Sequence, residues 1–312
     1  MDQVAKLLKS RYGLAIQRLE AAPRGWTGVT YVATVRDGAR YFIKVYPRHR
    51  LPRTAIGALP VLAELHQHGL TEVSRPITAT SGALHEWLGS DLVVVFDYLD
   101  ATQVEAATLA GDQRGDLIAR VHQQTEQLES PLERETFEVR SADELWPLLT
   151  RARQEPASDE PRRGLLRFLD QQENGITQAA ASFNEVAEAC RAARFELVLT
   201  HSDWPFNLLQ GADHTIYLVD WDEMLLAPAE RDTWFGGDDP AFWRGYCARR
   251  SGHVENELAT AFYLHDRYFE ELHANAQIIL GDDMPERRDW ALALLSNNWM
   301  TSLRSRIGKQ LT

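Results

Sequence analysis

The sequence has little cysteine, a deficit of basic residues and no long apolar run. Among its 312 residues the two cysteines are Cys190 and Cys247, and no CxxC or Cys/His spacing of a structural zinc site is present. No run of about 18 apolar residues occurs, so no membrane span is expected. The N-terminal residues lack the apolar stretch of a signal peptide. We therefore expect a reduced, cytoplasmic protein with both cysteines as buried thiols.

The charge balance excludes some partners and favours others. Lys and Arg number 33 and Asp and Glu number 45, which gives a formal net charge of −12. Binding to nucleic acid needs clustered cations that neutralise phosphates, so a nucleic-acid partner is disfavoured. A negative field instead concentrates small cationic molecules. The length suits one large or two modest domains, and the sequence says nothing about the oligomeric state.

Hydrophobic patterning divides the chain into a strand-rich first third and a mainly helical remainder. Apolar residues alternate over residues 29–35 and 41–45, and Asp37-Gly38 between them predicts a hairpin with a type I′ turn. A helix is predicted over residues 54–68 and a buried strand over 91–98. The later segments are predicted as helices near residues 117–128, 176–190, 255–273 and 286–304, an exposed loop over 151–163, and short strands between 196 and 220.

Four features follow one another in the order expected of a phosphoryl-transfer enzyme. They are the turn Gly25–Gly28, Lys44 on the next strand, His201-Ser202-Asp203 with Asn207, and Asp220 after an apolar strand. The transferred group is almost all negative charge, so catalysis consists of positioning and charge neutralisation. A lysine neutralises nucleotide phosphates, one aspartate orients the acceptor hydroxyl and takes its proton, and an asparagine and a second aspartate hold Mg²⁺.

Each feature alone has an ordinary structural explanation. A glycine turn, an edge-strand lysine, a helix cap and a turn aspartate occur in many proteins. Their shared order and spacing favour the kinase-like interpretation.

These motifs resemble the aminoglycoside phosphotransferase family, which has a protein-kinase-like fold. THSDWPFNLL matches the family pattern H-[GS]-D-x(4)-N-[VL]-[LI] except that three residues instead of four separate its aspartate from its asparagine, and IYLVDWDEMLLAPAERDTWF matches the family's I-D-W-x(n)-D segment. Within the family, the HSD, VDWDE, LAP, ERD and WFGG segments are most similar to the spectinomycin phosphotransferase branch. The resemblance covers most of the chain and is strongest over residues 199–237.

The resemblance implies an α+β, bilobal fold with a small antiparallel-sheet N-lobe and a larger, mainly helical C-lobe. It implies a nucleotide-binding lobe over residues 1–96, a hinge at 97–100 and a catalytic and substrate-binding lobe over 101–312. It also implies ATP or GTP and Mg²⁺ as cofactors. The implied roles are as follows: Asp203 catalytic; Gly25, Thr27, Gly28, Lys44, Asp97, Tyr98 and Leu99 at the nucleotide; Asn207 and Asp220 at the metal; His201 and Asp232 bracing the catalytic loop.

Two positions depart from the family pattern. The family places its asparagine five residues after the catalytic aspartate, whereas Asn207 follows Asp203 by four. The family's helix glutamate that pairs with the strand lysine has no counterpart near residues 56–58, and Glu64 is the only acid on that helix. Lys44 is therefore expected to be held differently from the family's lysine, or less firmly.

The resemblance and the charge together predict an ATP-dependent O-phosphotransferase for a small cationic, hydroxylated molecule. The leading acceptor is an aminocyclitol or aminoglycoside antibiotic such as spectinomycin, in a resistance role. Two alternatives stay open: a kinase of a choline-, sugar- or amino-alcohol-like metabolite, and a catalytically weak nucleotide-binding relative. The acids expected at the acceptor are Asp222, Glu223, Asp266 and Glu270.

Overall fold

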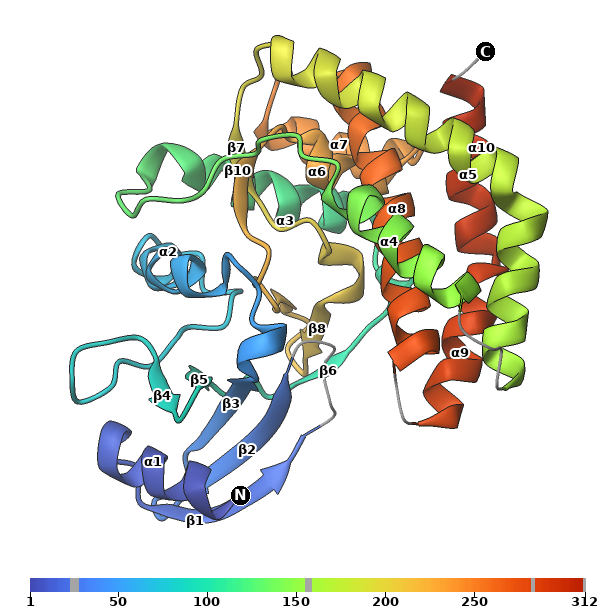
Figure 1. Cartoon of the computed structure of the whole chain (residues 1–312). Coiled ribbons are helices and arrows are strands. Elements are labelled where there is room, and N and C mark those ends of the chain that lie inside the picture. The colour runs from blue at the N-terminus through green and yellow to red at the C-terminus, as the bar shows by residue number, and fades with distance from the viewer. Residues whose placement is uncertain (23–27, 155–158, 282–283, 311–312) are drawn as a thin grey trace. The chain divides into compact units, whose positions relative to one another are not determined.

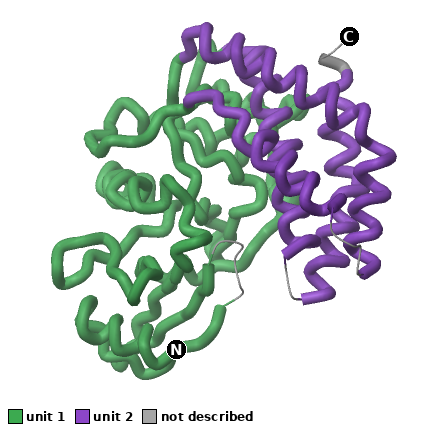
Figure 2. The backbone as a smooth tube through the Cα atoms, viewed as in Figure 1, with its two compact units in different colours: residues 1–135, 196–253 green, residues 136–195, 254–312 purple. Residues whose placement is uncertain are grey.

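The computed structural model describes residues 1–22, 28–154, 159–281 and 284–310 of the chain. These residues fall into two compact units, drawn in green and purple in Figure 2. Unit 1 comprises residues 1–135 and 196–253, and unit 2 comprises residues 136–195 and 254–312. This division differs from the predicted division into lobes at residues 97–100, which stays a prediction. The predictions for Gly25 and Thr27 lie outside the described residues.

Unit 1 begins with an antiparallel sheet of five strands in the order β1-β2-β3-β5-β4 (Figure 1). Alternating residues of β3 and β5 belong to two different apolar clusters. Ile43 and Val95 pack with residues of helix α1, whereas Tyr46 and Val94 pack with residues of helix α2. Successive side chains of a strand point to opposite faces of the sheet, so both faces carry apolar residues. A helix covers each of these faces. The bounds are α1 Asp2–Tyr12, β1 Ile16–Ala21, β2 Val29–Val35, β3 Arg40–Tyr46, α2 Ala55–Gln67, β4 Glu86–Leu88 and β5 Asp91–Asp97.

The predicted hairpin between β2 and β3 is confirmed, but its predicted turn type is wrong. A type I′ turn needs positive φ at both central residues. Gly38 has φ 90°, whereas Asp37 is not among the residues with positive φ. The Gly38 N–H donates to the Val35 carbonyl and the Val35 N–H donates to the Ala39 carbonyl. The loop thus holds three residues, and its glycine takes the single left-handed position.

The rest of unit 1 consists of short strand pairs and two closely packed helices. Helices α3 and α7 cross at glycines: a Cβ on Gly115 would lie 2.0 Å from the Phe242 carbonyl oxygen. A Cβ on Gly245 would lie 2.0 Å from the Asp112 carbonyl oxygen. Three strands pair in the order β6-β8-β9, and β7 pairs with β10. The bounds are β6 Ala101–Gln103, α3 Gly111–Gln123, β7 Val198–Thr200, β8 Leu208–Gly211, β9 Ile216–Leu218, β10 Leu225–Ala227, α6 Glu230–Thr233 and α7 Pro240–Arg249. One-turn 3₁₀ helices occur at η1 Arg48–Arg50, η2 Ala106–Thr108, η3 Gln124–Gln127, η4 Trp204–Phe206 and η5 Trp234–Gly236.

The described part of unit 2 is helical. Its helices are α4 Arg140–Gln154, α5 Glu160–Ala192, α8 Glu257–Gly281, α9 Pro285–Leu295 and α10 Asn298–Gln310. Phe183 of α5 stacks on Phe269 of α8 with ring centroids 5.6 Å apart. The predicted loop over residues 151–163 is wrong at both ends, because α4 continues to Gln154 and α5 starts at Glu160. The sequence predicts Pro161 in this loop, whereas the structure places it in the first turn of α5. Proline is tolerated there because the N–H that it lacks would have no partner in the first helical turn.

The sequence also predicts that the chain has no membrane span and that both cysteines are buried. In the described ranges, no helix is long and apolar enough to cross a membrane. Cys190 is buried, as predicted, whereas Cys247 is only half-buried at the edge of an apolar cluster. The prediction of two buried thiols therefore holds for Cys190 alone.

Candidate functional site

Lys44 lies in the middle of the N-terminal sheet and contacts two carboxylates of the turn after β9. It pairs with Thr30 on β2 and Val94 on β5, and 6% of the residue is exposed. Its Nζ donates to Asp220 Oδ1 and, at 2.6 Å, to Asp222 Oδ2. The strand lysine and the second motif aspartate, predicted from sequence to act together, are thus in direct contact.

The turn after β9 places both aspartates on the lysine. Asp220 has φ 66°, a left-handed conformation that is uncommon for residues other than glycine. Trp221 is 3% exposed, and its indole Nε1 donates to the Leu218 carbonyl at 2.9 Å. The buried tryptophan fixes the turn, and Asp220 and Asp222 on either side of it face the ammonium group. Backbone strain of this kind is common at functional sites.

Burial and mutual contact shift the pKa values of these groups. Burial disfavours the charged form of Lys44, but Asp222 and Asp220 outweigh this effect and raise its pKa. Burial also opposes ionisation of Asp220, yet the Lys44 ammonium holds the pKa of that carboxyl below its usual range. Burial, together with the charge of Asp220, raises the pKa of Asp222 to about 6. Asp220 is therefore the firmly ionised member of the pair.

The predicted catalytic loop follows strand β7 and is held by the β8–β9 hairpin. His201 Nε2 contacts the Val219 carbonyl at 2.9 Å, and the Asp203 N–H donates to His201 Nδ1 at 3.2 Å. The Val219 N–H donates to the Asn207 carbonyl at 3.0 Å. Val219 directly precedes Asp220, so this hairpin brings Asp203, Asn207 and Asp220 to one end of unit 1.

Asp232 binds the backbone of the predicted catalytic loop. Its carboxylate accepts from the backbone N–H of His201 at 2.9 Å and of Ser202 at 2.7 Å. Its Oδ2 also lies 3.1 Å from His122 Nε2, and none of the Asp232 side chain is exposed. Ser202 has φ 79°, so two successive N–H groups converge on one anion. The contacts are those expected of a bracing residue.

The short spacing between Asp203 and Asn207 is accommodated by the single turn η4. The Asn207 amide Nδ2 donates to the Asp203 carbonyl at 2.9 Å and to Asp203 Oδ2 at 3.2 Å. Among the described residues no donor contacts Asn207 Oδ1, so this oxygen is available to a cation. Asn207 therefore lies against Asp203, the predicted catalytic residue, although the loop between them is one residue short.

Oxygen donors at this end of the hairpin fit a magnesium ion better than a zinc ion. Asp220 keeps 42% of its side chain exposed, and Asn207 adds an amide oxygen. In the part of the chain that the structure describes, no cluster of three or more His, Cys, Asp or Glu residues suits a metal. Mg²⁺ commonly takes one or two protein carboxylates and completes its shell with water and substrate phosphates. The donor set thus fits a cation that is shared with a nucleotide.

The remaining nucleotide candidates have distinct surroundings. A Cβ on Gly28 would lie 2.6 Å from the Val45 carbonyl oxygen, so close approach to β3 by itself requires glycine there. At the predicted hinge, the Asp97 N–H already donates to the Arg75 carbonyl at 3.0 Å. The ring of Tyr98 lies under the Arg40 guanidinium at 4.1 Å. The Leu99 N–H has no acceptor among the described residues, which leaves it available to a ligand.

The four acids predicted at the acceptor do not share one environment. Asp222 contacts Lys44 and accepts from the Tyr46 hydroxyl at 2.5 Å. Glu223 is exposed and accepts from the Ser202 hydroxyl at 3.2 Å, next to Asp203. Asp266 and Glu270 belong to α8 of unit 2. An acceptor role stays a prediction for all four, and Glu223 has the position in unit 1 that suits it.

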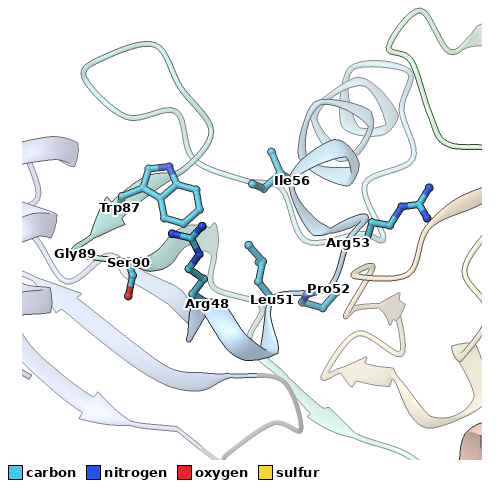
Figure 3. A pocket seen from close by; sticks show the side chains of 8 residues that line it. All are labelled: Arg48, Leu51, Pro52, Arg53, Ile56, Trp87, Gly89 and Ser90. Atoms are coloured by element: carbon cyan, nitrogen blue, oxygen red, sulfur yellow. The ribbon is translucent and has the colours of Figure 1, made fainter. Parts of the chain in front are cut away.

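A basic pocket lies beside the segment that leads into α2. It has a volume of about 570 Å³ and is lined in part by Arg48, Leu51 and Trp87, as Figure 3 shows. Arg53, also in its lining, forms an ion pair with Glu133 at 2.7 Å. Thr54 follows directly, and its hydroxyl donates to the Asp222 carbonyl. The segment at this pocket is thus joined to the lysine site by one hydrogen bond.

Sequence reasoning missed three residues of this site: Tyr46, Thr54 and His122. Tyr46 is two residues from Lys44 on the same strand, and the period of two was a signal that the two side chains share a face. Thr54 and His122 carry no motif. Their contacts with Asp222 and Asp232 join residues more than 100 positions apart.

Glu64, the only acid on α2, does not take the place of the absent helix glutamate, because its carboxylate is used elsewhere. Its carboxylate accepts from the Ser130 hydroxyl and from the backbone N–H groups of Ser130 and Glu129, at 3.2 and 3.0 Å. Glu64 therefore anchors a loop, and Lys44 is paired instead with Asp220 and Asp222.

Comparisons with known proteins identify the family and the fold. A family model described as "Phosphotransferase enzyme family" matches residues 18–290. A search of curated proteins gives no match. Among solved structures, spectinomycin phosphotransferase APH(9)-Ia in complex with ADP and spectinomycin is similar at 20% identity and TM-score 0.76, with 98% of each chain covered.

Two further structures share the fold at lower similarity. Amicoumacin kinase hAmiN, solved with AMP-PNP, Ca²⁺ and Ami, has 15% identity and TM-score 0.61, with 99% of this chain and 93% of that chain covered. Choline kinase LicA from Streptococcus pneumoniae has 13% identity and TM-score 0.58, with 98% of each chain covered. The predicted fold class, α+β and protein-kinase-like with an antiparallel N-terminal sheet and a mainly helical C-terminal part, is confirmed. Because the family model spans most of a chain with this fold, the chain belongs to the phosphotransferase enzyme family, as a phosphotransferase with an alcohol group as acceptor.

Proposed function

We propose that the protein transfers the terminal phosphoryl group of a nucleoside triphosphate, ATP or GTP, to a hydroxyl of a small cationic molecule. The proposed acceptor class is an aminocyclitol or aminoglycoside antibiotic such as spectinomycin. One observation carries the proposal: Lys44 contacts Asp220 at the end of the hairpin that also holds Asp203 and Asn207. The four residues to which we assign the chemistry therefore all belong to unit 1.

In the proposed reaction Asp203 acts on the acceptor. Its carboxylate orients the acceptor hydroxyl and takes its proton as the hydroxyl oxygen bonds to the terminal phosphorus. The bond between that phosphorus and the bridging oxygen breaks, and the nucleoside diphosphate leaves with the electron pair. No covalent enzyme intermediate is needed. The contact of Asn207 Nδ2 with Asp203 Oδ2 keeps that carboxylate in place.

Lys44, Asn207 and Asp220 act on the nucleotide. The Lys44 ammonium would contact the α- and β-phosphates, and Asn207 and Asp220 would hold Mg²⁺. A bound divalent cation supplies neutralisation of the phosphate charge. The hinge backbone at residues 97–99 would meet the nucleotide base, with the Leu99 N–H as the available donor. Gly25, Thr27 and Gly28 would line the phosphate loop.

The acceptor class rests on charge. The net charge of −12 concentrates cations around the protein, and Glu223 is exposed next to Asp203. Asp266 and Glu270 are proposed as further acceptor contacts. We also propose the lobe boundaries given by the sequence, residues 1–96, 97–100 and 101–312, and a cytoplasmic protein without nucleic-acid or membrane partners.

A metabolite kinase is the second candidate. The choline kinase named above shares the fold over nearly the full length of both chains, and choline is also a small cation with a hydroxyl. The same residues would carry out the chemistry, because the two functions differ only in the acceptor.

An acceptor-dependent assay of nucleoside diphosphate release tests both candidates. Wild-type protein with ATP and Mg²⁺ is offered spectinomycin, a panel of aminoglycosides, choline and amino-alcohols. Asp203→Asn is expected to reduce turnover at least 1,000-fold while nucleotide affinity is kept. Asp213→Asn is the matched control, because Asp213 is an exposed turn residue of the same hairpin whose role asparagine can fill.

Release that depends on spectinomycin supports the antibiotic kinase, and release that depends on choline or an amino-alcohol supports the metabolite kinase. Nucleotide binding without turnover on any acceptor would support the remaining alternative, a catalytically weak nucleotide-binding relative. Turnover that survives in Asp203→Asn would contradict the mechanism.

A further inference from the structure

The two carboxylates on Lys44 are anchored very differently. Asp222 has 13% of its side chain exposed and Asp220 has 42%. Both oxygens of Asp222 are in use: Oδ2 accepts from Lys44 at 2.6 Å and Oδ1 accepts from the Tyr46 hydroxyl at 2.5 Å. Asp220 is in contact with Lys44 through Oδ1. Asp222 is thus fixed to the sheet at two points, whereas Asp220 keeps an open side.

The backbone around Asp222 is also fixed. Its own carbonyl accepts from the Thr54 hydroxyl, just before α2. Its neighbours in the turn, Trp221 and Met224, are 3% and 0% exposed, and the Met224 N–H donates to the Trp221 carbonyl at 3.3 Å. A side chain on such a turn has little freedom to leave its partners.

Lys44 needs a counter-charge that remains when a nucleotide arrives. An ammonium group buried to 6% exposure is costly unless it is paired. Helix α2 cannot supply the partner, because its only acid, Glu64, is bound to Ser130. Among the residues that the structure describes, Asp220 and Asp222 alone form ion pairs with Lys44.

We propose that Asp222 is the permanent counter-ion of Lys44 and takes the place of the missing helix glutamate, so that Asp220 can exchange the lysine for a cation. Asp222 is then a positioning residue that acts through Lys44, and this inference rests on the proposed phosphotransferase function. An ammonium group has three donor hydrogens. One stays with Asp222, and the others become available to phosphate oxygens once Asp220 turns to the cation.

The proposal replaces the acceptor role that sequence predicts for Asp222. A residue that recognises a cationic acceptor needs a carboxylate oxygen open to it. Both oxygens of Asp222 are already paired with Lys44 and Tyr46. The exposed neighbour Glu223 has the accessibility that Asp222 lacks.

Nucleotide affinity tests the inference without any acceptor. Binding of AMP-PNP is measured by calorimetry with Mg²⁺ and again with EDTA. Asp222→Asn is expected to weaken binding at least tenfold under both conditions, because Lys44 loses its fixed partner. Asp222→Glu is expected to recover at least part of the loss, and Asp213→Asn, the matched control, to bind within twofold of wild type.

A double-mutant cycle with Lys44→Ala shows whether Asp222 acts through the lysine. Asp222→Asn is expected to add less than a twofold change in the Lys44→Ala background, because the lysine through which it acts is gone. An equal effect in both backgrounds, or wild-type affinity in Asp222→Asn, overturns the inference. Where an acceptor is in hand, Asp222→Asn is expected to raise the KM for ATP, and a rise in the acceptor KM alone would also overturn it.

Tyr46→Phe keeps the test decisive if Asp222→Asn does not fold. It removes only the hydroxyl that fixes Asp222 Oδ1 and is expected to weaken AMP-PNP binding three- to tenfold, whereas unchanged binding contradicts the inference. If wild-type protein binds AMP-PNP and these variants bind equally well, the inference alone fails. If wild-type protein binds no nucleotide, the proposed function fails with it.

Discussion

Replacing Asp232 by asparagine is expected to destabilise unit 1 and to disable the catalytic loop together. The carboxylate is fully buried and accepts from His201 N, Ser202 N and His122 Nε2 at 2.9, 2.7 and 3.1 Å. Burial disfavours its ionised form, but the contact with His122 and the backbone N–H groups hold the pKa of Asp232 below its usual range. The asparagine keeps one acceptor oxygen and turns an NH₂ group toward a donor.

The size of the effect follows from the donors that lose their acceptor. A buried N–H left without a partner costs about 1–3 kcal/mol, and a hydrogen bond to a charged group contributes about 1.5–3 kcal/mol. With one donor orphaned and the others weakened, we expect Asp232→Asn to cost about 3–5 kcal/mol. For a domain of roughly 150–250 residues this corresponds to a fall in Tm of about 6–20 °C.

Thermal unfolding and steady-state kinetics at a temperature well below both Tm values check this prediction. Asp213→Asn, the same chemical change at an exposed turn, is the control and should shift Tm by less than about 2 °C. Because His201 and Ser202, which directly precede Asp203, lose their support, kcat should fall at least tenfold in folded Asp232→Asn. A variant with wild-type Tm and kcat would refute the assignment of Asp232 as the brace of the loop.

Three further predictions concern packing, pH and backbone conformation. Gly115→Ala should lower stability by about 1–3 kcal/mol in a denaturant titration, because its Cβ would clash with Phe242; Gly175→Ala, with open space around it, should be neutral or stabilising, and equal effects would contradict the close helix contact. Burial lowers the pKa of His253 to about 4. The folded state therefore resists protonation of His253. The stability that depends on neutral His253 is complete above about pH 6.5 and is lost as the pH falls toward 4, by about 1.4 kcal/mol at pH 5.5. His253→Asn should flatten the fall of Tm over this range, and an unchanged slope would rule out His253 as its source. Ser202→Gly should raise Tm slightly and keep activity, because φ 79° costs a serine about 1 kcal/mol; a lower Tm would show that the Ser202 hydroxyl matters more than its backbone.

The sequence was sufficient to predict the elements that bear motifs and their order. Alternating apolar residues gave β2 and β3, and the period of two placed Lys44 inside the sheet. The resemblance assigned Lys44 and Asp220 to one reaction, but the sequence did not predict that their side chains are in direct contact. Local patterns of this kind reflect which face of a strand or helix is buried.

Other features depend on interactions that local patterns do not encode. Asp222 reaches Lys44 because Asp220 adopts a left-handed conformation and Trp221 is buried between them. The hairpin at Asp37-Gly38 has a three-residue loop, although the same dipeptide is typical of a two-residue turn. Pro161 starts a helix where it was interpreted as part of a loop. In each case tertiary packing selects among conformations that the local sequence allows.

The engagement of Glu64 with Ser130 has a consequence for how the enzyme could be controlled. A kinase whose catalytic lysine is held by a helix can be switched off by swinging that helix away. Here α2 contributes no ion pair to Lys44, and the partners of the lysine come from a short turn anchored by a buried tryptophan. The position of Lys44 is therefore set by the fold of unit 1 and does not depend on an ion pair from α2. The sequence of α2 is therefore expected to tolerate substitutions that keep its apolar face. The hydrogen bond from the Thr54 hydroxyl, just before the helix, to the Asp222 carbonyl must also be kept.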